Sequence, residues 1–253
     1  GQVAKLTASD ASSSDVFGTS VAIDGNTIVV GARYDDDGGS DSGSAYVFRT
    51  TDGWGTYTEI KLTASDGASE DYFGRSVAIA GNTVVIAAYN DDDGGDNSGS
   101  VYVFLTTDGG ATYDQVAKLT ATDAAADDYF GHSVAIDGDA IVVGAAYDSN
   151  APGGYYDDGY ASGSAYVFRT TDGGATYSQV AKLMAADAQS QDHFGFSVAF
   201  DGATIVVGAP HADEPQIAEG SAYVFSPPAP TAQPTPRPTW TFQPTPQPTM
   251  SPK

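Results

Sequence analysis

The chain has 253 residues, and 33 acidic against 10 basic residues give it a formal net charge of −23. This charge excludes ordinary nucleic-acid binding, which needs Lys and Arg to neutralise phosphates, and it favours cations as partners. The chain has no Cys, so no disulfide framework is expected, and no apolar run approaches the ~20 residues of a transmembrane helix.

The chain opens on a strand-like segment, residues 2–8, which precedes the first of four similar units. Each unit begins near a Phe-Gly pair, at residues 17, 73, 130 and 194, and continues through SVA, VVGA-type and YVF runs. No helical periodicity is visible. Repeats of this length, built from short apolar runs, are typical of one β-sheet blade per repeat.

Each complete unit is predicted to hold four strands, labelled A to D in chain order. In the second unit they cover residues 76–79, 83–87, 100–104 and 113–119. Alternating polarity and β-branched residues favour strands. Strands A and B are joined by a tight glycine turn, such as Asp24-Gly25, because glycine adopts the positive φ angles that such hairpins need.

The two ends of the repeat array are complementary. The last unit supplies strands A, B and C but no D, whereas segment 2–8 is a D strand with no A, B or C before it. We therefore expect residues 1–225 to form an all-β, four-bladed propeller in which the N-terminal strand completes the C-terminal blade. Two alternatives remain. The strand could complete a neighbouring molecule's last blade and form an open polymer, or the units could belong to a longer array.

These units resemble the FG-GAP repeat, through the repeated Phe-Gly pair, the VVGA segment and Gly208-Ala209-Pro210. The resemblance implies a β-propeller like the N-terminal domain of integrin α-subunits, although integrin propellers have more blades. Family members serve adhesion, ligand binding and display alike. The family's calcium motif lies between strands A and B, but here that connection is a short turn with too few oxygen ligands for Ca²⁺. The chain therefore resembles a metal-free variant of the repeat.

The connections between strands C and D resemble the Asp-box hairpin of sialidase-like propellers. Thr106, Asp108, Gly110 and Thr112 fit its pattern, and the third unit repeats it, whereas the first unit has Trp54 at the Gly position. The motif implies a carboxylate that caps the turn's backbone amides, not sialidase activity.

Most acidic residues fall in the B–C and D–A connections, which a four-stranded meander places on one face. These carboxylates repel one another, and bound cations would relieve the repulsion. We expect Ca²⁺ there, since it prefers hard oxygen ligands on flexible loops. The candidate metal ligands are Asp35, Asp36, Asp37, Asp41, Asp91, Asp92, Asp93, Asp96, Asp157 and Asp158. The alternative is a solvated face that keeps the protein soluble.

No catalytic group stands apart from the repeated acids. The three histidines, His132, His193 and His211, show no spacing of a zinc site or a catalytic triad. The sequence therefore predicts that the chain is not an enzyme. Three tyrosines in the third unit's longer B–C loop could stack on sugar rings, or that loop could be a simple insertion.

Residues 226–253 form a separate Pro/Thr-rich segment with a repeated Gln-Pro-Thr cadence. Such composition favours an extended or polyproline II stalk and is typical of O-glycosylated spacers, as in microbial wall glycoproteins. The candidate glycosylation sites are Thr231, Thr235, Thr239, Thr245 and Thr249. Trp240 and Phe242 are apolar and are candidate docking points for assembly.

Together these features predict a non-enzymatic structural or adhesive module of a cell-surface or secreted glycoprotein assembly, with fibre formation as one outcome. Its expected partners are further copies, other surface glycoproteins and glycans, without nucleic acid or membrane insertion. Deleting residues 226–253 is expected to abolish assembly. The alternative is an integrin-like receptor propeller that binds a protein or glycan through its acidic loop face and does not self-associate.

Overall fold

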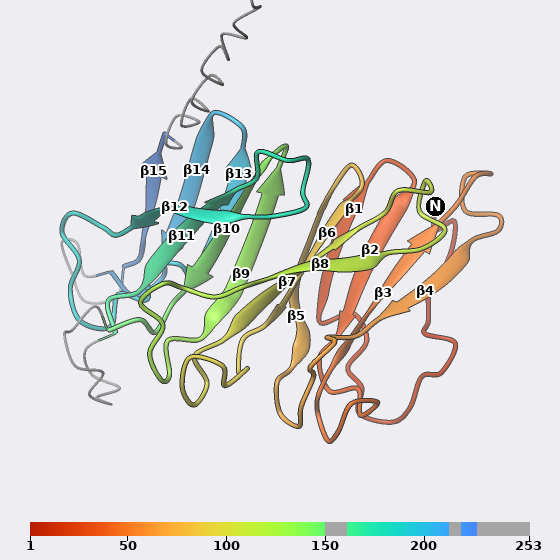
Figure 1. Ribbon diagram of the computed structural model, residues 1–253, viewed down its shortest axis with the longest axis horizontal. Coiled ribbons are helices and arrows are strands. Elements are labelled where there is room, and N and C mark those ends of the chain that lie inside the picture. The colour runs from red at the N-terminus through yellow and green to blue at the C-terminus, as the bar shows by residue number, and fades with distance from the viewer. Residues whose placement is uncertain (150–160, 213–218, 227–253) are drawn as a thin grey trace, which may run out of the picture.

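The computed structural model describes residues 1–149, 161–212 and 219–226, and these residues form an all-β structure of four antiparallel sheets (Figure 1). The predicted fold class and the four-repeat organisation are confirmed. Among the described residues, none belongs to a helix that is long and apolar enough to cross a membrane.

The first two sheets have four strands each, in chain order. Sheet 1 consists of β1 (Ser20–Asp24), β2 (Thr27–Ala32), β3 (Ser44–Arg49) and β4 (Thr58–Leu62). Sheet 2 consists of β5 (Phe73–Ala80), β6 (Thr83–Ala88), β7 (Ser100–Leu105) and β8 (Asp114–Leu119).

The last two sheets follow the same plan, but the final one is a strand short. Sheet 3 consists of β9 (Phe130–Asp137), β10 (Ala140–Ala145), β11 (Ser164–Arg169) and β12 (Ser178–Leu183). Sheet 4 consists of β13 (Ser197–Asp201), β14 (Thr204–Ala209) and β15 (Ser221–Phe225).

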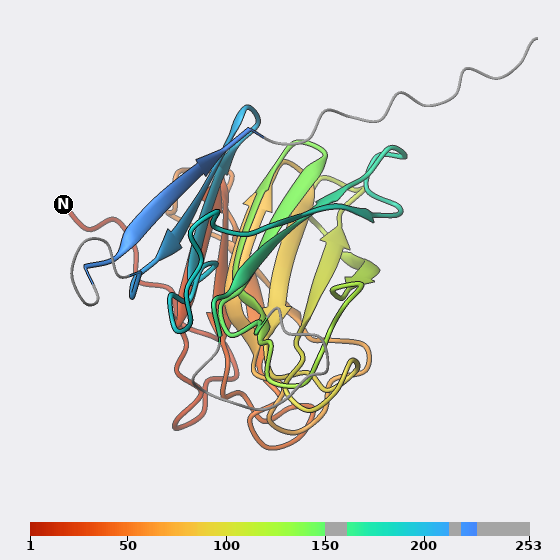
Figure 2. The same ribbon diagram turned by 90° about the vertical axis from the view of Figure 1, so that its left-hand side faces the viewer.

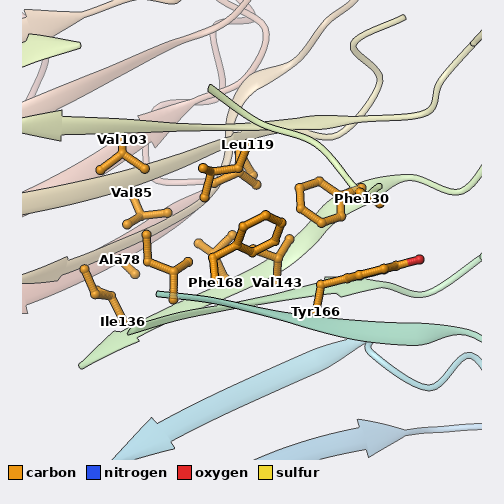
Figure 3. Packing of buried hydrophobic residues seen from close by; sticks show 14 of the residues in the cluster. Ala78, Val85, Val103, Leu119, Phe130, Ile136, Val143, Tyr166 and Phe168 are labelled. Atoms are coloured by element: carbon orange, nitrogen blue, oxygen red, sulfur yellow. The ribbon is translucent and has the colours of Figure 1, made fainter. Parts of the chain in front are cut away.

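Successive sheets stack face to face in the order 1, 2, 3, 4 along the long axis of the molecule (Figure 1). One apolar cluster fills each interface. The central cluster, drawn in Figure 3, joins Val85 and Val103 of sheet 2 to Phe130, Val143 and Phe168 of sheet 3. Because the middle sheets are covered on both faces, their central strands are largely apolar, and all six residues of β10 are buried.

The Phe-Gly pair explains how closely the sheets approach. Phe73 is completely buried, and its backbone N–H donates to the Ser42 carbonyl of sheet 1 at 2.9 Å. Gly74 follows with φ of 92°, and a Cβ on Gly31 would collide with the Gly74 carbonyl oxygen. Glycine is needed on both sides of this contact because any side chain would separate the two backbones.

The expected closure of the ring is not observed. Residues 1–8 form no strand, sheet 4 has three strands, and the N-terminus lies at the sheet 1 end of the row, opposite β15 (Figure 1). Ala8 is buried in the sheet 1 cluster, and the Ser9 hydroxyl and N–H donate to Glu59 of β4 at 2.9 and 3.0 Å. The residues that follow β4 and β8 make the same bond to the next sheet, so this contact is compatible with strand pairing. The segment does not pair with β15 because sheets 1 and 4 lie at opposite ends of the row (Figure 1).

Several predicted features lie outside the described residues. They are Asp157 and Asp158, the tyrosines of the same loop, and the Pro/Thr-rich segment with its threonines and with Trp240 and Phe242.

Candidate functional site

The acidic connections gather at one end of the sheets. We define the acidic loop face as the β2–β3 and β6–β7 connections, residues 146–149 and 161–163 of the β10–β11 connection, and the segments that precede β1, β5 and β9. These loops lie along the lower edge of the molecule in Figures 1 and 2. The antiparallel topology therefore places the B–C and D–A connections on one face, as the sequence predicted.

A lysine lies at the centre of the acids in sheet 1. The Lys61 Nζ of β4 is 2.7 Å from Asp10 and 3.0 Å from Asp35, and it also contacts Asp37. The Tyr46 hydroxyl of β3 bonds Asp10 at 2.8 Å and Asp35 at 2.9 Å. We call this arrangement of acids, tyrosine and lysine the lysine cluster.

The lysine cluster recurs in the next two sheets. Lys118 of β8 contacts Asp66, Asp91 and Asp93 at 2.8, 2.9 and 2.5 Å. Lys182 of β12 contacts Asp123 and Asp148, both at 2.7 Å. In each cluster one acid precedes the sheet's first strand and the others belong to its B–C loop, so the lysine ties two connections together.

Burial and hydrogen bonding set the ionisation of these groups. Asp35 is only 4% exposed, which favours its neutral form, but hydrogen bonds from Lys61 and Tyr46 outweigh burial and hold its pKa below the usual range. Burial opposes the charged form of Lys61 as well, yet its bonds to Asp10 and Asp37 raise its pKa. The cluster is thus a fixed ion network at neutral pH.

Six of the eight predicted metal ligands that the structure describes fall into two groups, and Asp41 and Asp96 belong to neither. Those at the lysine clusters are Asp35, Asp37, Asp91 and Asp93, whose carboxylates contact an ammonium group. Asp36 and Asp92 instead accept the N–H of Asp41 and Asn97, at 2.8 and 2.7 Å. Within the described ranges, no three carboxylate or imidazole groups form a metal-binding cluster. Calcium binding stays a prediction.

Sequence reasoning missed the lysines because they belong to strands rather than to the acidic loops. The signal was present: a Lys-Leu pair ends segment 2–6, β4, β8 and β12 at the same repeat position. A cation that recurs once per repeat next to recurring acids predicts one ion pair per sheet.

The Asp-box hairpins have the predicted geometry. The Asp108 carboxylate accepts the N–H of Ala111 and Thr112 at 2.9 and 3.0 Å and the Thr112 hydroxyl at 2.7 Å. In the first copy Asp52 accepts the N–H and the hydroxyl of Thr56 at 2.9 and 2.8 Å, although Trp54 replaces glycine. Trp54 adopts φ of 76°, and its N–H donates to the Thr50 hydroxyl at 2.9 Å.

A row of aromatic rings crosses all four sheets next to the acidic loop face. Neighbouring ring centroids are 4.7 to 5.8 Å apart along Tyr34, Tyr72, Tyr89, Tyr129, Tyr147, His193 and His211. Such spacings are those of favourable aromatic pairs. His132 lies against this row, and burial and the nearby Arg75 lower its pKa to about 4. The histidines therefore belong to a packing arrangement.

A polar hollow opens between sheets 1 and 2 on the acidic loop face. Its volume is ≈ 300 Å³, and its lining includes Asp37 and Ser42 of the β2–β3 loop and Thr63, Ala64 and Gly67 of the next connection. The hollow lies beside the first lysine cluster and is a candidate ligand site.

No curated protein matches the chain. Among solved structures, the crystal structure of Saccharomyces cerevisiae Sqt1 matches with 11% sequence identity and a TM-score of 0.46. The match covers 79% of this chain but only 44% of that one. The family model of the FG-GAP repeat matches residues 1–48, 57–104, 113–168 and 177–225, and the chain therefore belongs to the FG-GAP repeat family.

Proposed function

We propose that this repeat-based binding module is a non-enzymatic structural or adhesive unit of an extracellular glycoprotein assembly. The observation that carries the proposal is the recurrence of the lysine cluster. Its groups are the most densely paired ionisable residues on the acidic loop face, and the same arrangement occurs in three sheets. Recurrence in three of the four sheets indicates a common task, which is to join loops into a rigid surface.

The Pro/Thr-rich segment supports an extracellular role. Its composition is typical of O-glycosylated stalks, and the proposed acceptors are Thr231, Thr235, Thr239, Thr245 and Thr249. In this proposal the repeat array is the rigid body and residues 226–253 are the spacer, with Trp240 and Phe242 docking on a neighbouring array.

Intact mass spectrometry of the chain made in a eukaryotic secretory host tests the extracellular role. We expect secreted protein well above the bare 25.9 kDa, and a mass near the bare value after the five threonines are replaced by alanine. Native material with the bare mass, retained inside its cells, would contradict the proposal.

A chain that ends at residue 226 tests the spacer. We expect it to fold but to lose lateral assembly, as seen by electron microscopy beside the full chain. Bundles that form equally well without the segment would exclude its part in assembly. Trp240→Ala with Phe242→Ala in the full chain separates apolar docking from glycosylation.

The second candidate function is a receptor-like module that binds a protein or glycan through the acidic loop face. The ≈ 300 Å³ hollow beside Asp37 favours it. This function requires a ligand footprint on the loops and no self-association. Light scattering of the full chain distinguishes the two, because only the structural role predicts a mass that rises with concentration.

A further inference from the structure

The outer faces of the first and last sheets expose residues that the repeats elsewhere bury. Val21 and Ile23 of β1 are 69% and 65% exposed, whereas the matching Val77 and Ile79 of β5 are 7% and 8% exposed. At the other end Val224 of β15 is 70% exposed, and the matching Val47 of β3 is 1% exposed. Each end therefore presents one half of the apolar interface found between neighbouring sheets.

The polar contacts of the inner interfaces also have unpaired counterparts at the two ends. Between sheets 1 and 2, the Gly81 N–H donates to Asp24 at 2.6 Å and the Ser20 hydroxyl donates to the Gly74 carbonyl at 2.8 Å. Between sheets 3 and 4 the same positions repeat both contacts. At the open ends, sheet 4 presents the acceptor and hydroxyl positions, and sheet 1 presents the N–H and carbonyl positions. In sheet 4 the acceptor and hydroxyl positions are Asp201 and Ser197, and in sheet 1 the N–H and carbonyl positions are Gly25 and Gly18.

A reciprocal change of side-chain size indicates that these two ends fit each other. Gly110 of the second Asp box packs under Arg49 of the preceding sheet, and Gly174 lies under Leu105. The first Asp box has Trp54 at that glycine position, and the residue after β15, which matches Arg49, is Ser226. Inside the array a large side chain of one sheet packs over a glycine of the next. At the open ends the sizes are exchanged, since sheet 4 supplies the small residue and sheet 1 supplies tryptophan, so the combined volume of the two positions stays similar.

The N-terminal segment has the sequence of the fourth strand that sheet 4 lacks. Residues 2–6 read QVAKL, as β8 and β12 do. In sheet 2, Lys118 stands opposite Tyr102 in the register of β7 and β8. The same register on β15 places Lys5 opposite Tyr223, whose pKa is raised by burial and by a hydrogen bond to Asp187. Asp187 occupies the repeat position of Asp10, Asp66 and Asp123, so Lys5 would pair with that acid, whereas Ala212 stands at the position of the buried Asp35 and Asp91.

We propose that sheet 4 is completed by a second copy of this chain, which inserts residues 1–6 beside β15 and stacks its sheet 1 on the open face. The own N-terminus is held on sheet 1 by Ala8, by Ser9 with Glu59, and by Asp10 with Lys61, at the far end of the row from β15 (Figure 1). A second copy meets β15 without any bending of the array. The contact is head-to-tail, so copies add in a line or close as a ring of several molecules.

This inference deepens the proposed structural role, because it names the partner and the surface, and it rests on that role. Two charge-reversed variants of the full chain test it, Lys5→Asp and Asp187→Lys, with mass followed by sedimentation velocity over a range of concentrations. Each variant alone brings like charges together, and we expect association about tenfold weaker or more. An equimolar mixture restores both opposite-charge pairs between different molecules, so we expect association to return.

The same variants separate a second copy from ring closure within one chain. Closure predicts a monomer at all concentrations, no rescue by mixing, and rescue of stability in the Lys5→Asp/Asp187→Lys double variant. Either a concentration-independent monomer or failure of the mixture to associate would overturn the proposal. Neither result affects the secretion and mass measurements that test the extracellular role.

Val224→Asp tests the apolar part of the contact without disturbing the core, since Val224 is 70% exposed. We expect it to abolish association. Val180→Asp is the matched control, because Val180 is an exposed strand residue of sheet 3, away from both ends, and 37% exposed. Equal association of the two variants would count against the proposed interface.

Discussion

At the scale of single residues, the protein stabilises its acidic surface with very few cations. Lys61, Lys118 and Lys182 each contact at least two carboxylates, and each ammonium lies within 5.3 Å of a tyrosine ring centroid. Removing one cation leaves carboxylates that are partly desolvated and mutually repulsive. The lysines should therefore contribute more to stability than ordinary surface lysines do.

Lys118→Met should lower the free energy of unfolding by about 2 kcal/mol, because Asp91 is 4% exposed and would lose its ammonium partner. Lys5→Met is the matched control. Lys5 holds the same repeat position and is exposed, and no ion pair involves it in the part of the chain that the structure describes. Urea denaturation at a concentration where the chain is monomeric gives both values, and equal values would contradict a special role for the cluster.

Two buried acids, Asp128 and Asp71, should make the folded protein less stable as pH rises. Burial raises the pKa of Asp128 to about 7, with a further contribution from Asp148, and burial raises the pKa of Asp71 to about 6. A carboxyl with a higher pKa in the folded state binds its proton more tightly there. Its stabilising effect is complete below pH ~4, the pKa of the unfolded chain, and is lost as pH rises through the folded pKa.

Asp128→Asn should therefore increase stability at pH 8 by roughly 2 kcal/mol and have little effect near pH 4. The asparagine carbonyl can still accept the Ala125 N–H, which Asp128 accepts at 2.8 Å. Denaturation at several pH values between 4 and 8 measures the difference. A gain of the same size at every pH would show that the change acts through packing rather than through ionisation.

At the scale of elements, the contacts of sheet 1 with sheet 2 and of sheet 3 with sheet 4 depend on glycine pairs, whereas Ala87 faces Gly131 between sheets 2 and 3. A Cβ on Gly74 would collide with the Ser44 carbonyl of sheet 1, whereas a Cβ on Gly18 meets nothing within 4 Å. Their φ angles, 92° and 95°, impose nearly the same backbone strain on alanine. Comparing alanine variants at the two positions therefore separates the cost of backbone strain from the cost of the collision between sheets.

Gly74→Ala should lower the free energy of unfolding by about 3 kcal/mol or more, since strain and collision add. Gly18→Ala should cost only about 1 kcal/mol, from strain alone. Thermal and urea unfolding of both variants as monomers provide the comparison. Similar losses would show that the sheets can separate at this contact without cost.

The sequence predicted the elements well because each repeat contains its own signals. The glycine turns, the VVGA runs and the Asp boxes depend on neighbouring residues, and all of them appear where expected. Closure and cation pairing depend on residues far apart in the chain. Ser9 and Asp10, which follow the N-terminal segment, contact Glu59, Tyr46 and Lys61, which are 36 to 51 residues away in the chain.

At the scale of the whole molecule, the row of sheets has a sharp asymmetry of charge and of apolar surface. Acidic loops cover one edge, and apolar faces remain at the two ends. With a net charge of −23, copies repel each other at low ionic strength. Any end-to-end contact must therefore overcome a repulsion that salt screens over about 10 Å at 0.1 M.

Calcium should act on this surface in a way that simple screening does not. The lysine clusters already neutralise Asp35 and Asp91, but Asp36 and Asp92 are exposed and face solvent with only backbone N–H partners. If these carboxylates bind Ca²⁺ as the sequence predicts, Ca²⁺ raises the melting temperature more than NaCl of equal ionic strength, and chelator reverses the excess. Asp36→Asn with Asp92→Asn should remove the excess and leave the salt response intact, because screening depends on the whole charge rather than on two residues. Equal shifts of the melting temperature with both salts would show that the acidic loop face is a solvated surface that responds only to screening.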